Sequence, residues 1–305
     1  MSEILNFNAS SLLSGDIKNS IVPAGYVRFT LSTKGKVSKA PEVCFARAMT
    51  ALEVLNLSMY IKDELQGPLI NIVDSIIYKT DEKPIASIAE WSSEEVIEFL
   101  VRYYSNFFGT TLSETEYTPT KEEEDLLKTT KPDMFAAFIN KTWKPKFQLN
   151  LSTIDFFPLP EKISNRIVVT DEKNNFSVAF RFPQYGDILL VKQASESYTG
   201  EIDKSILLSL FSNVILIEKI QGTDVTSIPL KERLAMVLED PKFSLSLFGR
   251  VNTEFDNIRF GINDNIKIIS PVTEKPIERR CQFRVVDVLS AITLFESNDY
   301  AVRFE

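Results

Sequence analysis

The stretch 166–187 reads RIVVTDEKNNFSVAFRFPQYGD and carries a β-hairpin signal followed directly by a helix start. Alternation of period two predicts two strands, 167–170 and 176–182, joined by a polar turn. Asp187 is expected to cap a helix that runs to Ser195. The second strand places four apolar side chains on one face: Phe176, Val178, Phe180 and Phe182. A strand pair that leads straight into a helix is typical of an α+β protein.

Toward the N-terminus the sequence is mainly helical. Ser92 followed by Glu95 forms a capping box ahead of a strongly apolar helix that reaches residue 108. One strand is predicted over 26–31, and further helices are predicted over 41–62, 68–77 and 133–143. The region between 110 and 132 is polar and is interpreted as a surface segment with one short helix over 121–128. In the helix 41–62, spacings of two to four put one apolar face toward the core: Val43, Ala46, Ala48, Leu52, Leu55 and Met59.

Toward the C-terminus, strands and helices alternate. The pattern predicts a strand over 147–151, and helices over 203–217, 230–239 and 284–295. A second hairpin is predicted with its turn at 263–265. Its first strand carries Ile258, Phe260 and Ile262, which face Ile266 and Ile268 of its second strand. The expected fold class is therefore α+β, with a largely helical N-terminal half and antiparallel β-hairpins packed with helices in the C-terminal half.

Three domains are expected from these changes of pattern. Residues 1–25 are rich in Ser and Asn with scattered apolar side chains, and are interpreted as an extended arm that orders against the body or a partner. Residues 26–145 form a mainly helical domain with one N-terminal strand. Residues 146–305 form an α+β hairpin domain.

The amino-acid composition excludes the catalytic mechanisms that depend on histidine. The 305-residue chain contains no histidine, which is the usual general base near neutral pH and the commonest metal ligand. Ser/His/Asp catalysis, Cys/His catalysis and histidine-based zinc sites are therefore excluded. The two cysteines, Cys44 and Cys281, lie 237 positions apart. This spacing predicts two buried thiols in a reducing compartment rather than a metal knuckle or a disulfide framework.

The charge and hydropathy of the chain argue against nucleic acid and membrane as direct partners. The formal net charge is −8 and residues 114–125 are strongly acidic, whereas a nucleic-acid-binding protein normally carries a basic stripe. The longest nearly apolar run, 206–217, is shorter than the roughly 20 residues needed to cross a bilayer. The first residues, MSEILNFNASS, have no cationic region of the signal-peptide kind. We therefore expect a soluble intracellular protein without direct contact to nucleic acid or membrane.

The remaining candidates for chemistry have structural explanations. Cys281 lies among arginines that would favour a thiolate, but the chain has no imidazole base to make it a nucleophile. The segment 25–36, GYVRFTLSTKGK, lacks the residue order of a phosphate-binding loop and is interpreted as strand and turn. Five aspartates are of the residue type that binds Mg²⁺, but none belongs to a paired-carboxylate motif: Asp155, Asp171, Asp187, Asp256 and Asp264. The sequence therefore predicts no enzyme activity and no catalytic, cofactor-binding or metal-binding residues.

Three stretches in the second half of the chain follow an order that resembles a known family. They are 149–161 (LNLSTIDFFPLPE), 166–187 and 256–276 (DNIRFGINDNIKIISPVTEKP), followed by a hydrophobic C-terminal helix. This order resembles the baseplate hub assembly proteins of contractile-tailed phages, over about 150 residues. In that family a strand pair leads into an R-x-P-x-x-G-D-like corner before the helices, and a late strand carries a short ribbon.

The residues of the corner and of the late strand match the family pattern. The corner is matched by Arg181, Pro183, Gly186 and Asp187, and the late strand by Phe260 and Gly261. The ribbon 269–276 lacks the cysteine pair that relatives often carry, so a metal knuckle is not implied here. The family is not enzymatic, and the resemblance therefore implies a non-enzymatic assembly or structural protein of a phage tail or baseplate.

Three functions remain open from the sequence. The first is the phage tail or baseplate role, acting through protein–protein interfaces with other tail or baseplate proteins, or with further copies of the chain. It implies the host cytoplasm during assembly, or the virion, as the location. The second is an accessory subunit of a virally encoded multisubunit enzyme, and the third is a carboxylate-metal hydrolase. The interface candidates are apolar residues near the two ends: Ile4, Leu5, Phe7, Leu12, Leu13, Tyr300 and Phe304.

Overall fold

The computed structural model describes most of the chain and confirms the α+β class. All seven interface candidates, from Ile4 to Leu13 and at Tyr300 and Phe304, lie outside the described residues, and so does Cys281. Within the described part of the chain, every helix is too short or too polar to cross a membrane. The described ranges are 22–63, 65–78, 85–161, 163, 165–171, 175–200, 202–243, 245–258, 260–263, 265–280, 284–286 and 288–293.

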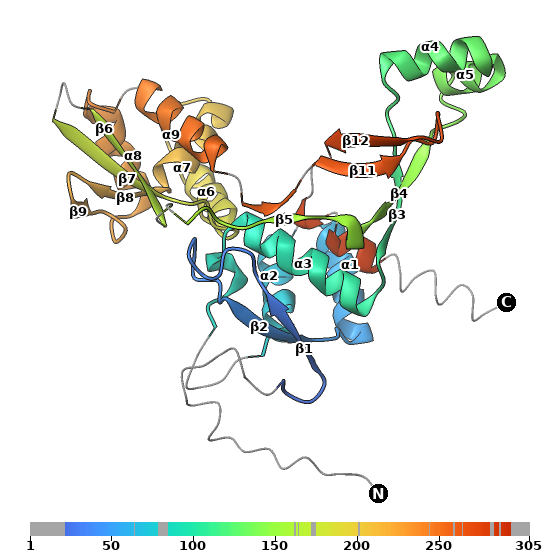
Figure 1. The fold of residues 1–305 in the computed structure, drawn as a ribbon. Coiled ribbons are helices and arrows are strands. Elements are labelled where there is room, and N and C mark those ends of the chain that lie inside the picture. Colours follow the sequence, from blue (N-terminus) through green and yellow to red (C-terminus); the bar gives the residue numbers. More distant parts are fainter. Residues whose placement is uncertain are drawn as a thin grey trace, which may run out of the picture.

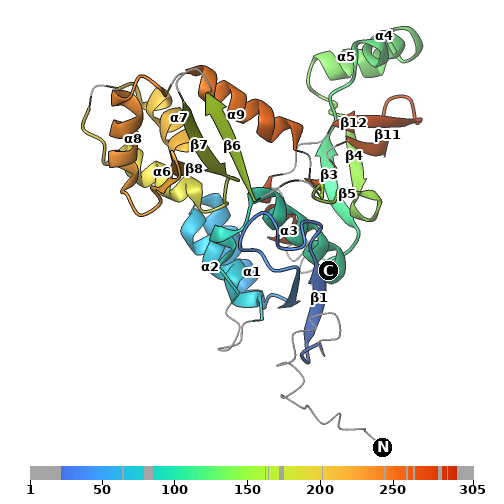
Figure 2. The same ribbon diagram turned by 60° about the vertical axis from the view of Figure 1, so that its left-hand side comes forward.

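Two globular parts and a projecting arm make up the described molecule (Figures 1 and 2). The central unit is built from the first half of the chain and lies between the other two parts. A lobe formed by residues 166–258 lies on one side of it. The arm, residues 111–150, extends on the other side and carries two short helices at its end.

The central unit packs a two-stranded antiparallel sheet and three α-helices around an aromatic core. Its elements are β1 (Tyr26–Thr30), β2 (Val43–Arg47), α1 (Ala51–Lys62), α2 (Gln66–Ile76), the 3₁₀ helix η3 (Ile88–Glu90) and α3 (Ser93–Phe107). The predicted capping box of α3 is present, because the Ser92 and Glu95 side chains each accept a hydrogen bond from the other's backbone N–H. Trp91 and Phe99 are fully buried and contact each other edge to face. The apolar pattern of α3 is therefore explained by the core.

The prediction of one helix over 41–62 is wrong. Residues 43–47 form β2, which pairs along its whole length with β1, and α1 begins only after its N-cap, Thr50. The face of α1 expected in the core also points the other way, since Val54 and Leu57 are buried whereas Leu52 is 65 % exposed. Residues 43–46 form a short apolar run, which fits a strand as well as a helix, and here pairing with β1 decides between them.

The lobe contains a four-stranded antiparallel sheet with its own hydrophobic core. Its strands are β6 (Arg166–Asp171), β7 (Phe176–Arg181), β8 (Ile217–Ile220) and β9 (Thr223–Asp224), in that order across the sheet. Its helices are α6 (Asp187–Glu196), α7 (Lys204–Val214), α8 (Leu230–Glu239) and α9 (Leu245–Asn257). The hairpin prediction is confirmed, because Ile167 pairs with Phe180 and all four predicted face residues are buried. The helix predicted over 203–217 ends at Val214, and Ile217 is the first residue of β8 instead.

Backbone hydrogen bonds join the lobe to the central unit at the predicted corner. Tyr185 N–H donates to the carbonyl of Trp91 at 2.8 Å, and Gly186 N–H donates to the carbonyl of Ala89 at 2.9 Å. A Cβ atom at position 186 would lie 2.8 Å from the carbonyl oxygen of Ala89. Glycine at this position therefore allows the close approach of the two parts.

The second predicted hairpin, across 263–265, is wrong in its pairing. β10 (Gly261–Ile262) pairs with β5 (Phe156–Phe157), about a hundred residues earlier in the chain. β11 (Asn265–Ile269) pairs instead with the following strand, β12 (Pro276–Arg280). The strand interpretation is right for Ile262 and for Ile266 and Ile268, but Ile258 and Phe260 lie outside the strands, and a long-range partner replaces the local one.

The end of the described chain returns to the central unit. Residues 285–286 and 288–293 are helical, in agreement with the predicted final helix. Val288, Leu289 and Ile292 are buried in the same hydrophobic cluster as Trp91 and Phe99. The lobe is thus inserted between two segments that share one core.

Candidate functional site

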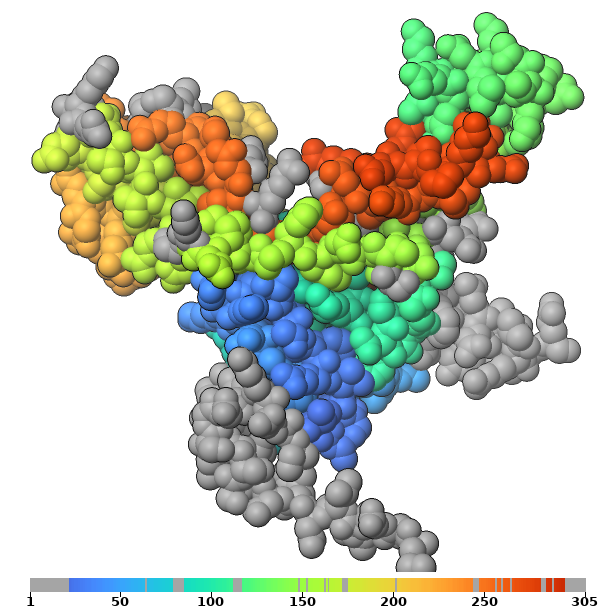
Figure 3. Space-filling view, in the orientation of Figure 1, coloured from blue at the N-terminus to red at the C-terminus, as the bar shows by residue number. Residues whose placement is uncertain are grey.

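The candidate functional site is the projecting arm. A two-stranded ribbon, β3 (Thr111–Glu116) and β4 (Lys146–Asn150), carries α4 (Lys121–Thr130) and α5 (Pro132–Ile139) at its far end. The space-filling view shows these two helices standing clear of the central unit and of the lobe, beside the hairpin β11–β12 (Figure 3). The arm therefore presents its tip to the surroundings.

Local signals explain the two helices of the tip. Thr120 and Glu123 form a capping box at the start of α4, and Pro132 occupies the first turn of α5, where its missing N–H costs nothing. The helices expected over 121–128 and 133–143 are both present, although α5 ends earlier, at Ile139. β3 was missed, because its sequence TLSETE has one aliphatic residue and takes its place through pairing with β4.

All side chains of α5 except Asp133 are apolar, yet none of them is buried. Ile139 is 58 % exposed, and Leu126 on the neighbouring α4 is also exposed. Two short helices cannot cover each other's apolar surface completely, so part of it faces solvent. We call this surface the apolar tip and define it by the exposed Leu126 and Ile139 together with the half-buried Met134, Phe135 and Phe138. Met134 and Phe135 also pack against the hydrophobic cluster of the central unit. Exposed aliphatic side chains beside half-buried aromatic ones are typical of a protein–protein contact.

A buried polar cluster fixes the arm to the hairpin β11–β12. The Glu123 carboxylate accepts hydrogen bonds from the hydroxyls of Ser270 and Tyr117, both at 2.6 Å. The guanidinium of Arg279 on β12 lies 3.2 Å from Glu123 Oε2 and donates to the Tyr117 hydroxyl oxygen at 2.9 Å. We call Tyr117, Glu123, Ser270 and Arg279 the Glu123 cluster. It connects segments far apart in the sequence and restrains the root of α4.

The electrostatics of the Glu123 cluster favour the charged carboxylate. Burial alone would raise the pKa of Glu123, but the hydrogen bonds from Ser270, Tyr117 and Thr120 hold that pKa below its ordinary value. Burial and the neighbouring carboxylate raise the pKa of Tyr117, so its hydroxyl keeps its proton and remains a donor. The cluster therefore acts as a fixed structural contact near neutral pH.

Two further buried carboxylates, Glu95 and Glu98 on α3, hold the loop between β1 and β2. Glu98 accepts from the backbone N–H of Ser32 at 2.9 Å and from its hydroxyl at 2.6 Å. Glu95 accepts from Thr33 at 2.5 Å and from the hydroxyl of Ser38. Together with the contacts of Glu95 to Ser92 and of Glu98 to Arg102, these hydrogen bonds give both carboxylates structural partners. Neither their spacing nor their surroundings indicate catalysis.

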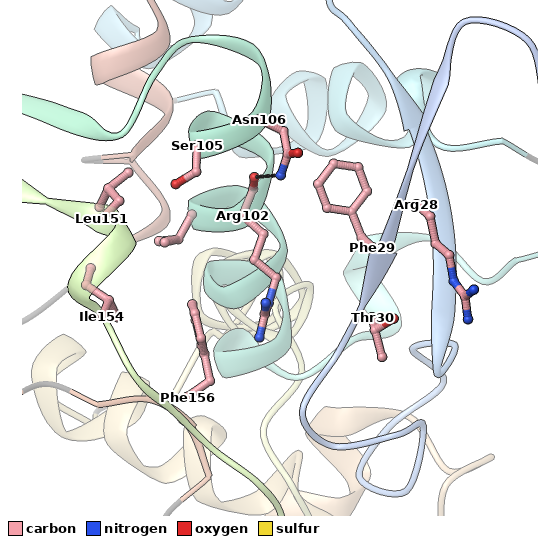
Figure 4. A pocket seen from close by; sticks show the side chains of 10 residues that line it. Arg28, Phe29, Thr30, Arg102, Ser105, Asn106, Leu151, Ile154 and Phe156 are labelled. Carbon is pink, nitrogen blue, oxygen red and sulfur yellow. Dashed lines mark hydrogen bonds between the residues drawn. The ribbon is translucent and has the colours of Figure 1, made fainter. Parts of the chain in front are cut away.

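A pocket of about 450 Å³ lies between β1, α3 and the segment 151–156 (Figure 4). Its charged groups are already engaged or turned away: Arg102 pairs with Glu98 at 2.8 Å and lies over the Phe156 ring, and Arg28 points away from α3. None of the lining residues is a carboxylate or a thiol, so the pocket has no acid–base pair. The lining is Arg28, Phe29, Thr30, Val101, Arg102, Ser105, Asn106, Leu151, Ile154 and Phe156.

The structure gives structural roles to several residues considered for chemistry. Asp187 accepts from both terminal nitrogens of Arg181, at 2.7 and 2.8 Å, so it does not cap α6 with its side chain as expected. Burial raises the pKa of the Cys44 thiol to about 12, which makes it a poor nucleophile. Within the described residues, no group of three or more Cys, Asp or Glu side chains is placed to hold a metal ion.

The site residues of the arm differ from those expected from the sequence. Residues 110–132 were expected to form only a surface segment, and the predicted interface residues belong to terminal segments outside the described residues. The capping box at Thr120 and Glu123 and the apolar run in α5 were readable signals. The partnership of Glu123 with Ser270 and Arg279 had no local signal, because these residues are about 150 positions away.

Comparisons of this chain with protein-family models, with curated proteins and with solved structures gave no match.

Proposed function

We propose that this protein is a non-enzymatic assembly or structural protein of a phage tail or baseplate, and that it acts through protein–protein interfaces. The observation that carries the interface role is the apolar tip at the end of the arm, where α5 has no buried residue. The phage context is supported by the order of sequence motifs, with Arg181, Pro183, Gly186 and Asp187 at the corner.

The tip suits the role of a contact surface on energetic grounds. Burying one large aliphatic side chain contributes about 1.5 to 3 kcal/mol, and a few such residues at the centre of an interface supply most of its binding energy. The Glu123 cluster restrains the root of the arm, which reduces the conformational entropy lost on binding. Other tail or baseplate proteins, or a second copy of the chain, are the partners that this proposal implies. The proposal places the protein in the host cytoplasm during assembly, or in the virion.

The experiment compares two matched surface variants in infected cells. Ile139→Lys changes the apolar tip, whereas Val168→Lys changes an equally exposed aliphatic residue on β6, in the lobe; their exposed fractions are 58 % and 59 %. The tagged wild-type chain and the Val168→Lys variant are expected to retain tail or baseplate proteins, identified by mass spectrometry, while Ile139→Lys loses them. Retention of the same proteins by Ile139→Lys would show that the tip is not the contact. Absence of tail proteins from the wild-type sample would exclude the phage-tail role.

The non-enzymatic part of the proposal has its own test. Purified protein with Mg²⁺ or Mn²⁺ is expected to leave nucleotide, ester and phosphodiester substrates unchanged. Turnover that is abolished by a single Asp→Asn substitution would contradict this expectation. The alternatives of a hydrolase and of an enzyme subunit predict such turnover, alone or after addition of the captured partners.

A further inference from the structure

The outer face of α1 is an exposed apolar surface on the central unit, remote in the chain from the arm. Leu52, Leu55 and Met59 recur at spacings of three and four and are 65, 60 and 53 % exposed. The helix begins with Thr50 as its N-cap and buries Val54 and Leu57 on the opposite side. The outer α1 face is made of six exposed residues: Ala51, Leu52, Leu55, Ser58, Met59 and Lys62.

This face has the composition of a contact surface rather than of an ordinary solvated helix side. Exposed faces of surface helices usually carry charged residues at most positions, but here Lys62, at the end of the helix, is the one charged residue among the six. Three large apolar side chains side by side are more than scattered surface residues. Their burial by another segment would contribute several times the roughly 1.5 to 3 kcal/mol of one such side chain.

We propose that residues 1–21 of the same chain cover the outer α1 face. This segment contains eight large apolar residues, and its placement lies outside the described part of the chain: Met1, Ile4, Leu5, Phe7, Leu12, Leu13, Ile17 and Ile21. The segment and the outer α1 face thus supply apolar surface that each could bury against the other.

The attachment point of the segment lies close to α1. Tyr26 in β1 pairs with Arg47, and the Arg47 guanidinium binds the Glu53 carboxylate of α1 through two contacts of 2.7 and 2.8 Å. The described chain begins at Val22, four residues before Tyr26. The 12 residues of α1 span about 18 Å, and 21 residues reach up to about 70 Å when extended, so the whole face is within reach.

Methionine methyl NMR on the full chain tests the proposal, because the sequence has only five methionines. A soluble paramagnetic probe broadens exposed methyl signals. Met59 on the outer α1 face is compared with Met49, which is buried, and with Met236, which is 39 % exposed on α8. In the full chain we expect Met59 to broaden as little as Met49.

Two variants of the N-terminal segment provide the matched comparison. In Leu12→Asp/Leu13→Asp, the Met59 signal is expected to broaden as much as that of Met236. Ser10→Asp/Ser11→Asp adds the same charge at neighbouring polar positions and is expected to leave Met59 protected. Because these positions lie outside the described core, unchanged Met49 and Met236 signals verify that each variant is folded.

Two results would overturn the proposal. Met59 could broaden as strongly as Met236 in the unmodified chain, which would mean that nothing covers the face. Alternatively, its protection could survive Leu12→Asp/Leu13→Asp and vary with protein concentration, which would assign the face to a second copy. The measurement uses purified protein without a partner, so its outcome is independent of the role proposed for the apolar tip.

Discussion

Glu123 and Arg279 lie 156 residues apart in the sequence, and the Arg279 Nη2 atom is 3.2 Å from Glu123 Oε2. One residue begins the helical tip of the arm and the other lies in the last described strand. Through this pair and its hydroxyl neighbours, Tyr117 and Ser270, the hairpin β11–β12 braces the arm. The direction in which the tip projects therefore depends on a contact between distant parts of the chain.

Glu123→Gln is expected to lower the free energy of unfolding by about 1 to 3 kcal/mol near pH 7, because a buried acceptor of several hydrogen bonds loses its charge. The folded-state pKa of Glu123 lies below its ordinary value. Its stabilisation is therefore present above the unfolded pKa and is lost as the pH falls through the folded pKa. Urea denaturation at about pH 7 and about pH 3 should show a smaller difference between wild type and variant at the lower pH. The exposed neighbour substitution Glu122→Gln serves as control, and an equal effect there would contradict the prediction.

Glu53→Gln gives a second pH-dependent test, in the central unit. The hydrogen bond from Arg47 lowers the pKa of Glu53 from 4.5 to about 2. The wild type is thus expected to exceed the variant in stability by about 2 to 3 kcal/mol near pH 7, with the difference disappearing between about pH 5 and pH 2. Thermal unfolding across that range measures the difference. A difference that grew toward low pH would show that the carboxylate is not stabilised by Arg47.

Phe180→Ala and Arg181→Ala separate the two faces of β7. Phe180 is fully buried, and loss of its ring is expected to cost about 3 to 5 kcal/mol of unfolding free energy. Arg181 forms two hydrogen bonds with Asp187, so its removal is expected to cost about 1.5 to 3 kcal/mol, not the small amount typical of an isolated surface residue. Chemical denaturation of Arg181→Ala, Asp187→Ala and the double variant tests this. Strictly additive losses would mean that the pair does not interact.

Gly186→Ala is expected to destabilise the junction between the lobe and the central unit by about 1 to 3 kcal/mol. The added methyl group would lie 2.8 Å from both the Cβ and the carbonyl oxygen of Ala89, and backbone atoms there have little freedom to move. Gly249, inside α9, has open space around its Cα, so Gly249→Ala should instead stabilise by about 0.5 to 1 kcal/mol. Denaturant unfolding of both variants measures the contrast. Similar effects of the two substitutions would show that contact with Ala89 is unimportant.

The parts of the fold that could be predicted are those whose signals are local. The capping box of Ser92 and Glu95 contains its own hydrogen-bond partners within four residues, and the start of α3 follows from it. The alternation that ends at Phe182 has an adjacent partner strand, so the hairpin β6–β7 was predictable in both pairing and buried face. In both cases the interacting residues are close in the sequence.

The parts that were missed depend on distant partners. Val43 starts a strand because β1 lies beside it, although its neighbours also fit a helical spacing. Gly261 and Ile262 pair with β5 rather than with the next apolar run, and no local pattern distinguishes these partners. The Glu123 cluster of the candidate site is of the same kind. Periodicity indicates which residues are apolar on one face, but not which segment covers that face.

The hydrophobic core of the central unit combines residues from both ends of the described chain, and this affects folding during synthesis on the ribosome. Trp91 and Phe99 share their cluster with Val288 and Leu289, which are translated nearly 200 residues later. At about 5 to 20 residues per second, the early segment waits roughly 10 to 40 s for the helix that completes its core. The lobe, whose core lies entirely within 167–251, is complete before then. The nascent chain is therefore expected to complete the core of the lobe first, while the apolar residues of the central unit still lack the side chains of the last described helix.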